Sequence, residues 1–159
     1  MDLPPLLHYP SVAEYKRHYE RCYQRTAIVT FDGIRVYFAS QKFGHAFYEN
    51  SQRIKGPKDE FSFVRAQRMD WIKATLENPD ARIYQGWNNK DKTYEEDRRV
   101  SVVYEDFVVV IELSLNKQGE LKGNFVTCYV ADQSIDQISK SPEWSLDKCL
   151  EKLRGRNCR

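Results

Sequence analysis

The alternation of apolar and polar positions predicts an amphipathic helix near the beginning of the chain, over residues 11–25. Ser11 and Glu14 have the spacing of a capping box, which starts the first helical turn directly after Pro10. Apolar residues then recur at intervals that line one face of an α-helix. They are Val12, Tyr15, Tyr19, Cys22 and Tyr23. Residues 1–25 are therefore expected to form an N-terminal helical arm.

After this arm the pattern changes to a period of two and predicts a β-hairpin. Residues 27–31 and 34–38 are rich in β-branched and aromatic side chains, and Asp32-Gly33 between them is a typical two-residue turn. Residues 39–59 contain Gly44 and Gly56 and show no long period. We expect them to form a loop or a broken helix, long enough to suggest a functional role.

The middle of the chain predicts one helix, over residues 59–78, and then a run of strands. The helix ends at Asn78-Pro79, and its stripe contains Phe61, Arg65, Met69, Ile72 and Leu76. Strands are predicted at 81–86, 99–104, 107–114 and 121–130, with polar turns between them. The polar tail, residues 132–159, is expected to form two short helices.

The predicted fold class is α+β, with residues 1–159 as a single domain. N-terminal helices pack on a single antiparallel four-stranded meander sheet, and a C-terminal helical tail of residues 132–159 follows it.

Composition adds that the chain is an ordinary folded protein. Of its 159 residues, 41% are hydrophobic, 13% are aromatic and 30% are charged with nearly balanced signs, which argues against intrinsic disorder. The longest wholly apolar run, residues 107–111, is too short to cross a bilayer, and the N-terminus lacks the apolar stretch of a signal peptide. We therefore expect a cytoplasmic protein with no membrane contact.

Charge is distributed unevenly, although the formal net charge is only +2. Residues 35–73 carry a net charge of +4, and residues 74–114 carry −4. A basic section beside an acidic one favours a ligand that bears phosphate, although ordinary solvated surfaces also show local excesses of this size.

The cysteines and histidines do not have the spacing of a metal site. The chain has four cysteines without a Cys-x-x-Cys pair, and only three histidines. We therefore expect no metal and no other cofactor. Cys128 lies in an apolar run and is interpreted as a small buried hydrophobic residue, with a catalytic Cys-His pair as the alternative.

One face of the last predicted strand suits a nucleic-acid ligand. A period of two places Phe125, Thr127 and Tyr129 on one face and the apolar residues 126, 128 and 130 on the other. Aromatic rings stack on bases and hydroxyls donate hydrogen bonds to phosphate, as in sheets that bind RNA. The alternative is an ordinary half-exposed face, because threonine and aromatic residues favour strands in any case.

Arg65 and His45 suit catalysis best. Arg65 interrupts an apolar stripe, so it reaches the edge of the stripe, pairs with an acid or lines a wet cleft. Its guanidinium suits phosphate oxygens, with Arg53 and Arg68 nearby. His45 lies among small residues and titrates near neutrality, so it is the best available general acid or base, with a structural role as the alternative. The other histidines, at positions 8 and 18, are expected at the solvated surface.

Together these side chains fit the metal-independent cleavage of RNA. Transesterification needs a base for the 2′-hydroxyl, an acid for the leaving oxygen, and donors around the phosphorane. His45, Arg65 and Thr127 or Tyr129 have the required chemistry. The sequence lacks a glycine-rich phosphate loop, a Gly-x-Ser-x-Gly elbow and a His-Glu-x-x-His motif, which argues against nucleotide hydrolases, serine hydrolases and zinc proteases.

The same stretches resemble a known group of nucleases. The order Gly-His-Ala-Phe at 44–47, Arg-Ala-Gln-Arg at 65–68 and Phe-Val-Thr-Cys-Tyr at 125–129 is similar to the phage and bacterial nucleases of the barnase, EndoU, colicin and RelE-like superfamily. The resemblance spans residues 35–131. It implies N-terminal helices before a four-stranded antiparallel sheet, and a ribonuclease that needs no metal and often acts as a toxin or phage effector.

The resemblance also implies roles for single residues. His45 would match the family's histidine, Arg65 its helix cation and Thr127 the hydroxyl of the last strand, with Tyr129 as a further donor. RNA is the implied substrate, and an antitoxin or immunity protein is an implied partner. The residues expected to bind the substrate are Arg53, Arg68 and Phe125.

Two departures keep other functions open. Cys128 stands where a small residue such as alanine is more usual, and the net charge is low for a ribonuclease. A non-catalytic module that binds RNA or a protein on the same fold is the main alternative. A DNA nuclease ranks last, because it ordinarily requires a metal.

Overall fold

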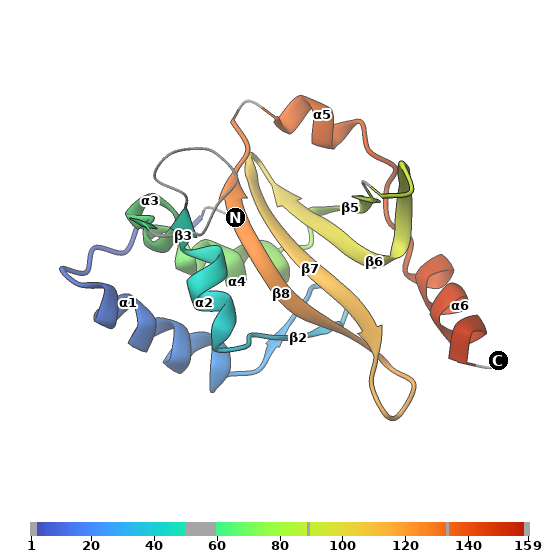
Figure 1. Ribbon diagram of the computed structural model, residues 1–159, viewed down its shortest axis with the longest axis horizontal. Coiled ribbons are helices and arrows are strands. Elements are labelled where there is room, and N and C mark those ends of the chain that lie inside the picture. The colour runs from blue at the N-terminus through green and yellow to red at the C-terminus, as the bar shows by residue number, and fades with distance from the viewer. Residues whose placement is uncertain (1–2, 50–59, 89, 133, 158–159) are drawn as a thin grey trace.

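The chain folds around a large sheet, with most of its helices on one face (Figure 1). The computed structural model describes residues 3–49, 60–88, 90–132 and 134–157. The helices in these ranges are α1 (Val12–Tyr19), the π-helical turn η1 (Glu20–Gln24), α2 (Gln41–Ala46), α3 (Phe63–Gln67), α4 (Met69–Glu77), α5 (Ile135–Ser139) and α6 (Leu146–Asn157). The strands are β1 (Ile28–Val29), β2 (Arg35–Tyr37), β3 (Tyr48–Glu49), β4 (Glu60–Phe61), β5 (Arg82–Asn88), β6 (Thr93–Tyr104), β7 (Phe107–Leu115) and β8 (Leu121–Val130).

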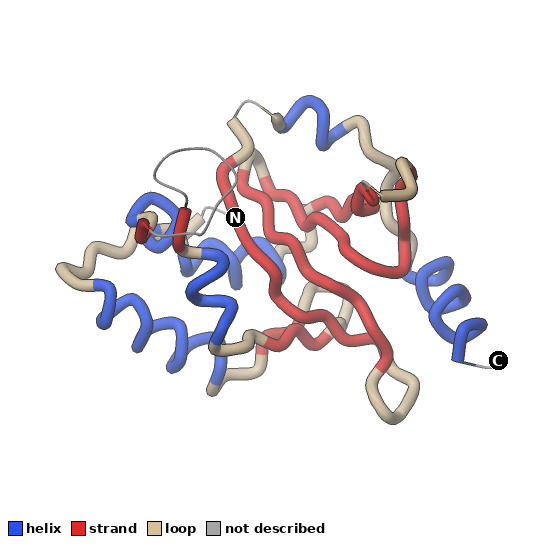
Figure 2. The backbone as a smooth tube through the Cα atoms, in the orientation of Figure 1, coloured by secondary structure: helices blue, strands red, loops and turns tan. Residues whose placement is uncertain are grey.

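The large sheet has six strands in the order β1-β2-β8-β7-β6-β5, and β3 pairs with β4 separately. The prediction of a four-stranded antiparallel meander is therefore wrong, although the α+β class is correct. The predicted meander strands exist as β5 to β8, each antiparallel to the next. The predicted hairpin adds β1 and β2, and β2 runs parallel to β8, so the sheet is mixed (Figure 2).

The error concerns pairing between segments far apart in the sequence. Residues 35–37 pair with residues 122–124, and no short turn connects the two strands. Local turn residues fix the register of a hairpin, whereas a parallel pair depends on a long crossover that a pattern of apolar residues does not specify.

The predicted N-terminal helix is present as α1 and η1. The hydroxyl of Ser11 accepts a hydrogen bond from the backbone N–H of Glu14 at 3.4 Å, as the capping-box spacing predicts. Tyr15, Tyr19 and Tyr23 point from this helix into the core and are almost completely buried. The arm therefore packs on the sheet through tyrosines.

The helix predicted over residues 59–78 is divided into shorter elements. Residues 60 and 61 form β4, Ser62 caps α3 through its hydroxyl, and a break at Arg68 separates α3 from α4. Residue 62 has an extended backbone conformation, so a single helix cannot start before it. The apolar stripe survives in α4, where Met69, Ile72 and Leu76 are completely buried.

The main core lies between the N-terminal helices and one face of the sheet. It combines tyrosines of the N-terminal helices with alternate residues of the strands, such as Val100, Val109 and Phe125. A smaller cluster on the other face contains Val108 and Tyr84 and is covered by Ile135 and Ile138 at α5. Helix α5 is thus a cover for the second face of the sheet.

Candidate functional site

A β-bulge in the middle of the last strand, β8, shifts which side chains point to each face of the sheet. Ile111 of β7 pairs with Phe125 and Val110 pairs with Thr127, so that Val126 is the extra residue. Phe125 therefore faces the main core with Cys128, whereas Thr127 and Tyr129 face the other side. The predicted common face of Phe125, Thr127 and Tyr129 is wrong, because the bulge inverts the alternation at one point.

On the side away from β7, the neighbours of β8 are first a strand and then helices. Strand β2 pairs only with residues 122–124 of β8. Further along, helices α2 and α3 lie against β8 (Figure 1). Strand β8 therefore contacts both a strand and helices on the side away from β7.

Arg65 belongs to α3, one of the helices that contact β8. Its backbone N–H donates to the Ser62 hydroxyl at 3.3 Å, and its Nη1 donates to the carbonyl of Ala46 at 3.4 Å. Ala46 is the last residue of α2, where a cation is favoured by the helix dipole. The guanidinium thus links α3 to the end of α2.

The charge of Arg65 also acts on β8. Burial raises the pKa of the Cys128 thiol to about 12, and the positive charge of Arg65 lowers it again in part. Burial likewise raises the pKa of the Tyr129 hydroxyl, and Arg65 opposes this rise. Both groups therefore remain protonated at neutral pH, and the Tyr129 hydroxyl can serve as a hydrogen-bond donor.

His45 and Thr127 are close in sequence to the residues just described. His45 belongs to the last turn of α2, directly before Ala46, and its side chain is exposed. Thr127 is half-buried and shares the outer face of β8 with Tyr129. The candidate site therefore consists of Arg65, bonded to the residue that follows His45, and of Tyr129 with Thr127 on β8, the strand that α3 contacts.

Two of the three residues expected to bind the substrate do not join this site, and the third cannot be placed. Phe125 is completely buried and stacks on Phe38 with a centroid distance of 4.9 Å, so it cannot stack on a base. Arg68 donates to the carbonyl of Val64 at 2.7 Å and lies over the ring of Trp71. Arg53 lies outside the described residues.

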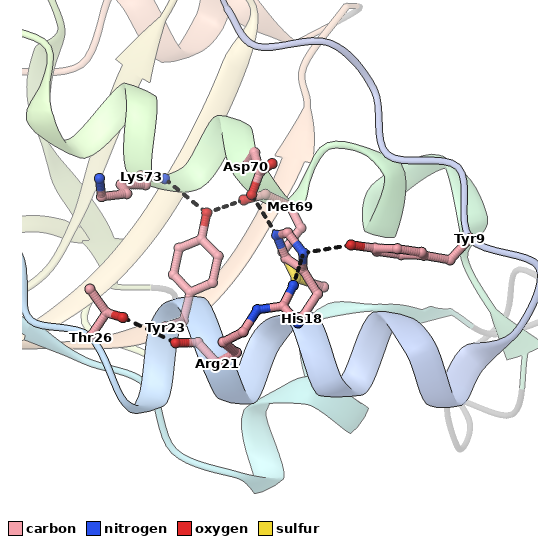
Figure 3. Close-up of polar contacts among 8 residues, drawn as sticks. All are labelled: Tyr9, His18, Arg21, Tyr23, Thr26, Met69, Asp70 and Lys73. Atoms are coloured by element: carbon pink, nitrogen blue, oxygen red, sulfur yellow. Dashed lines mark hydrogen bonds and ion pairs between the residues drawn. The ribbon is translucent and has the colours of Figure 1, made fainter.

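His18 is buried, so the expectation of a solvated surface group is wrong. Its Nε2 lies 2.6 Å from a carboxylate oxygen of Asp70, and its Nδ1 lies 2.9 Å from the Tyr9 hydroxyl (Figure 3). A carboxylate on Nε2 and a hydroxyl on Nδ1 fit the tautomer that carries its proton on Nε2. Both ring nitrogens are engaged, which favours a structural role over proton transfer to a ligand.

The described residues contain no group of three or more His, Cys, Asp or Glu side chains that could hold a metal ion. Among the helices that the structure describes, none combines the length and apolar character needed to span a membrane.

No protein-family model matches the chain, and neither a curated protein nor a solved structure shows significant similarity to it.

Proposed function

We propose that the protein is a metal-independent endoribonuclease with Arg65 at its centre. The supporting observation is the hydrogen bond that holds the Arg65 guanidinium at the end of α2, on a helix, α3, that contacts β8. A fixed guanidinium is suited to bind a phosphodiester and the charge of its phosphorane.

Each residue has a defined task in this reaction. His45, exposed beside Ala46, accepts the proton of the RNA 2′-hydroxyl, and the 2′-oxygen attacks phosphorus. Arg65 and Tyr129 stabilise the phosphorane, with Thr127 as a further donor. The bond from phosphorus to the 5′-oxygen then breaks, and the leaving oxygen takes a proton from solvent. The products are a 2′,3′-cyclic phosphate and a 5′-hydroxyl.

The test is cleavage of single-stranded RNA in EDTA by purified protein, with analysis of the product ends. We expect His45→Ala to lower the rate by about 10²- to 10⁴-fold, because the general base is lost. Arg65→Ala should lower it by about 10²- to 10³-fold, because charge stabilisation is lost. An absolute requirement for Mg²⁺ would contradict the mechanism.

Matched controls separate chemistry from folding. His8→Ala and Arg17→Ala remove an exposed histidine and an exposed arginine from other parts of the chain and should leave the rate unchanged. Arg65→Lys keeps the charge but loses the planar fork of donors, so its rate should lie between those of wild type and Arg65→Ala. Thermal melting of each variant shows whether the fold is intact.

A second candidate is a module on the same fold that binds RNA without cleaving it. It is favoured by the hydrogen bond from Arg65 to Ala46, since part of the guanidinium is used to cap a helix. This candidate predicts RNA that stays intact after long incubation and an affinity that falls steeply with salt. The same cleavage assay, combined with a binding titration, distinguishes the two.

A further inference from the structure

The hairpin of β5 and β6 is bent sharply near its middle. Gln85 pairs with Val100, but the next residue, Gly86, pairs with Glu95, so residues 96–99 of β6 are left out of the pairing with β5. Figure 2 shows the resulting turn in β6. The outer part of the hairpin, residues 86–88 and 93–95, forms an arm that leaves the plane of the sheet.

This bend depends on a glycine. A Cβ atom at Gly86 would lie 2.3 Å from the carbonyl oxygen of Arg99, far inside contact distance. The backbones of the two strands therefore approach each other as only glycine permits. Gly86 thus permits the sharp bend at the base of the arm.

The arm carries an exposed aromatic pair. Trp87 and Tyr94 are paired across the two strands, with ring centroids 5.0 Å apart and an interplanar angle of 68°. Their exposed fractions are 51% and 37%. Large aromatic side chains at such exposure are typical of binding surfaces, because burying them on a ligand stabilises the complex.

A cavity of about 410 Å³ lies between this arm and the sheet. We call it the arm cavity. One wall is the aromatic pair on the arm, the floor is formed by the outer face of the sheet, and the third wall belongs to α5 and the residues after it. The lining residues are Tyr84, Gln85, Gly86, Trp87, Tyr94, Ser101, Tyr129, Gln137, Ile138 and Ser141.

The wall formed by α5 is tied to the sheet. The backbone N–H of Gln85 donates to the carbonyl of Pro142 at 2.9 Å, and Tyr84 forms an antiparallel bridge with Glu143. In Figure 1 the segment after α5 runs beside the bent end of β6. The arm cavity is thus formed before any ligand arrives, as is usual for small-ligand sites.

The chemistry of the lining suits a neutral, flat and polar group. None of its described lining residues is charged. Within the described part of the chain, the side chains of Ser101, Tyr129 and Gln137 form no hydrogen bond with the protein, so their hydroxyl and amide groups are available to a ligand. A nucleobase has both a face that stacks on aromatic rings and edges that bond to hydroxyls and amides.

Tyr129 is common to the arm cavity and the proposed phosphate site. It lines the cavity from the outer face of β8, and in the proposed function it acts on the phosphorane together with Arg65. A base in the arm cavity would therefore belong to a nucleotide next to that phosphate. A nucleic-acid strand that passes over β8 from the side of the helices to the outer face connects the two.

We propose that the arm cavity binds a nucleobase of single-stranded RNA flanking the phosphate held by Arg65, by stacking on Trp87 and Tyr94 and by hydrogen bonds to Ser101 and Gln137. This inference rests on the proposed function for the identity of the ligand, but it concerns binding and not cleavage. The cavity would give the protein a preference for RNA with an unpaired base beside the cleaved bond.

The test uses a 2′-O-methyl RNA oligonucleotide, which lacks the attacking hydroxyl and cannot be cleaved by the proposed route. Binding is measured by fluorescence anisotropy at fixed salt concentration. Trp87→Ala should weaken binding by about 5- to 150-fold, the range expected for the loss of one stacked base. Trp87→Phe keeps a stacking surface and should retain most of the affinity.

A double-mutant cycle ties the effect to a base. Oligonucleotides with a single abasic position are compared on wild type and on Trp87→Ala. At one position the abasic change should weaken binding to wild type but have little further effect on Trp87→Ala. Additive losses at every position would overturn the proposal.

Tyr37→Ala is the matched control. Tyr37 is also exposed and lies on the same sheet, but Arg35 and Lys122 lie over its ring at 4.8 and 5.8 Å from the centroid. Its loss should change the affinity by less than about twofold, since a ring already covered by cations is not free to stack on a base. A loss equal to that of Trp87→Ala would contradict a specific base site.

The outcomes separate this inference from the proposed function. If RNA is not cleaved but the abasic cycle shows coupling to Trp87, the ribonuclease assignment is wrong and the base site stands. If RNA is cleaved in EDTA and Trp87→Ala binds as wild type does, the base site is wrong and the ribonuclease assignment stands. Binding of a protein partner but not of the oligonucleotide would overturn the base site as well.

Discussion

At the scale of single residues, the hydroxyls of buried tyrosines link distant segments of the chain through hydrogen bonds. The hydroxyls of Tyr15, Tyr19 and Tyr23, all on one face of the N-terminal helix, donate to the carbonyls of Leu7, Ala39 and Met69. A phenol combines a large apolar ring with one polar atom that needs a partner when it is buried. The ring packs in the core while the hydroxyl fixes a loop or a helix beside it.

His18 also links distant segments through hydrogen bonds, and we predict that its loss destabilises the fold. His18→Ala should lower the free energy of unfolding by about 1–3 kcal/mol, because Asp70 and Tyr9 lose a hydrogen-bond partner. Urea denaturation measures the change. His8→Ala, at an exposed position, should change it by less than about 0.5 kcal/mol. Equal effects of the two substitutions would contradict the structural role of His18.

At the scale of elements, single residues decide where helices and strands start, bend and end. Ser62 starts α3, and the break at Arg68 separates α3 from α4. The N-terminal segment is tied to these helices, because Leu7 donates to the carbonyl of Gln67 at 2.8 Å and Trp71 donates to that of Pro4 at 2.6 Å. These contacts hold the N-terminal segment against α3 and α4.

Two glycines should respond in opposite directions to the same substitution. Gly86→Ala should destabilise the protein by about 1–3 kcal/mol or more, because a methyl group there meets the Arg99 carbonyl. Gly44→Ala, inside α2 and with no atom within 4 Å of the added methyl group, should stabilise it by about 0.5–1 kcal/mol. Thermal melting of both variants checks this, and a stable Gly86→Ala protein would contradict the close approach of the strands.

At the scale of the whole molecule, the main core keeps several ionisable groups away from water. Burial raises the pKa of the Cys128 thiol from 9.0 to about 12 and that of Cys149 to about 11. It also raises the pKa of the Tyr19 and Tyr23 hydroxyls. All four groups are acids that the folded protein holds in their neutral form.

Stability should therefore fall in alkaline solution. Between pH 9 and 11 the unfolded chain releases thiol protons that the folded chain retains, so the free energy of unfolding decreases as the pH rises. The slope is about 1.4 kcal/mol per pH unit for each fully contributing group. The tyrosines add to it above pH 10, and below pH 9 the stabilisation by these four groups is complete.

Denaturation curves at several pH values test this slope. Cys128→Ala removes one ionisable group and should make the slope smaller between pH 9 and 11. Val109→Ala, at the position paired with Cys128, lowers the stability without removing an ionisable group and should leave the slope unchanged. Equal slopes in wild type and Cys128→Ala would show that the thiol does not contribute.

The sequence by itself determined the local elements, because capping residues, turns and apolar periods act over a few positions. Ser11 predicts the start of α1, and Asp32-Gly33 predicts the hairpin of β1 and β2. The strands β5 to β8 were also predictable from their apolar runs and turns. Arg65 stood out because a cation interrupts an apolar stripe.

Only the tertiary structure decided which of these elements meet. The parallel pairing of β2 with β8, the bulge at Val126 and the burial of His18 depend on contacts between positions far apart in the chain. The arm cavity gave no signal in the sequence, since Tyr129 and Trp87 are joined only through the sheet and its bend. A periodic pattern records which side of its own element a residue occupies, whereas packing selects the partner on that side.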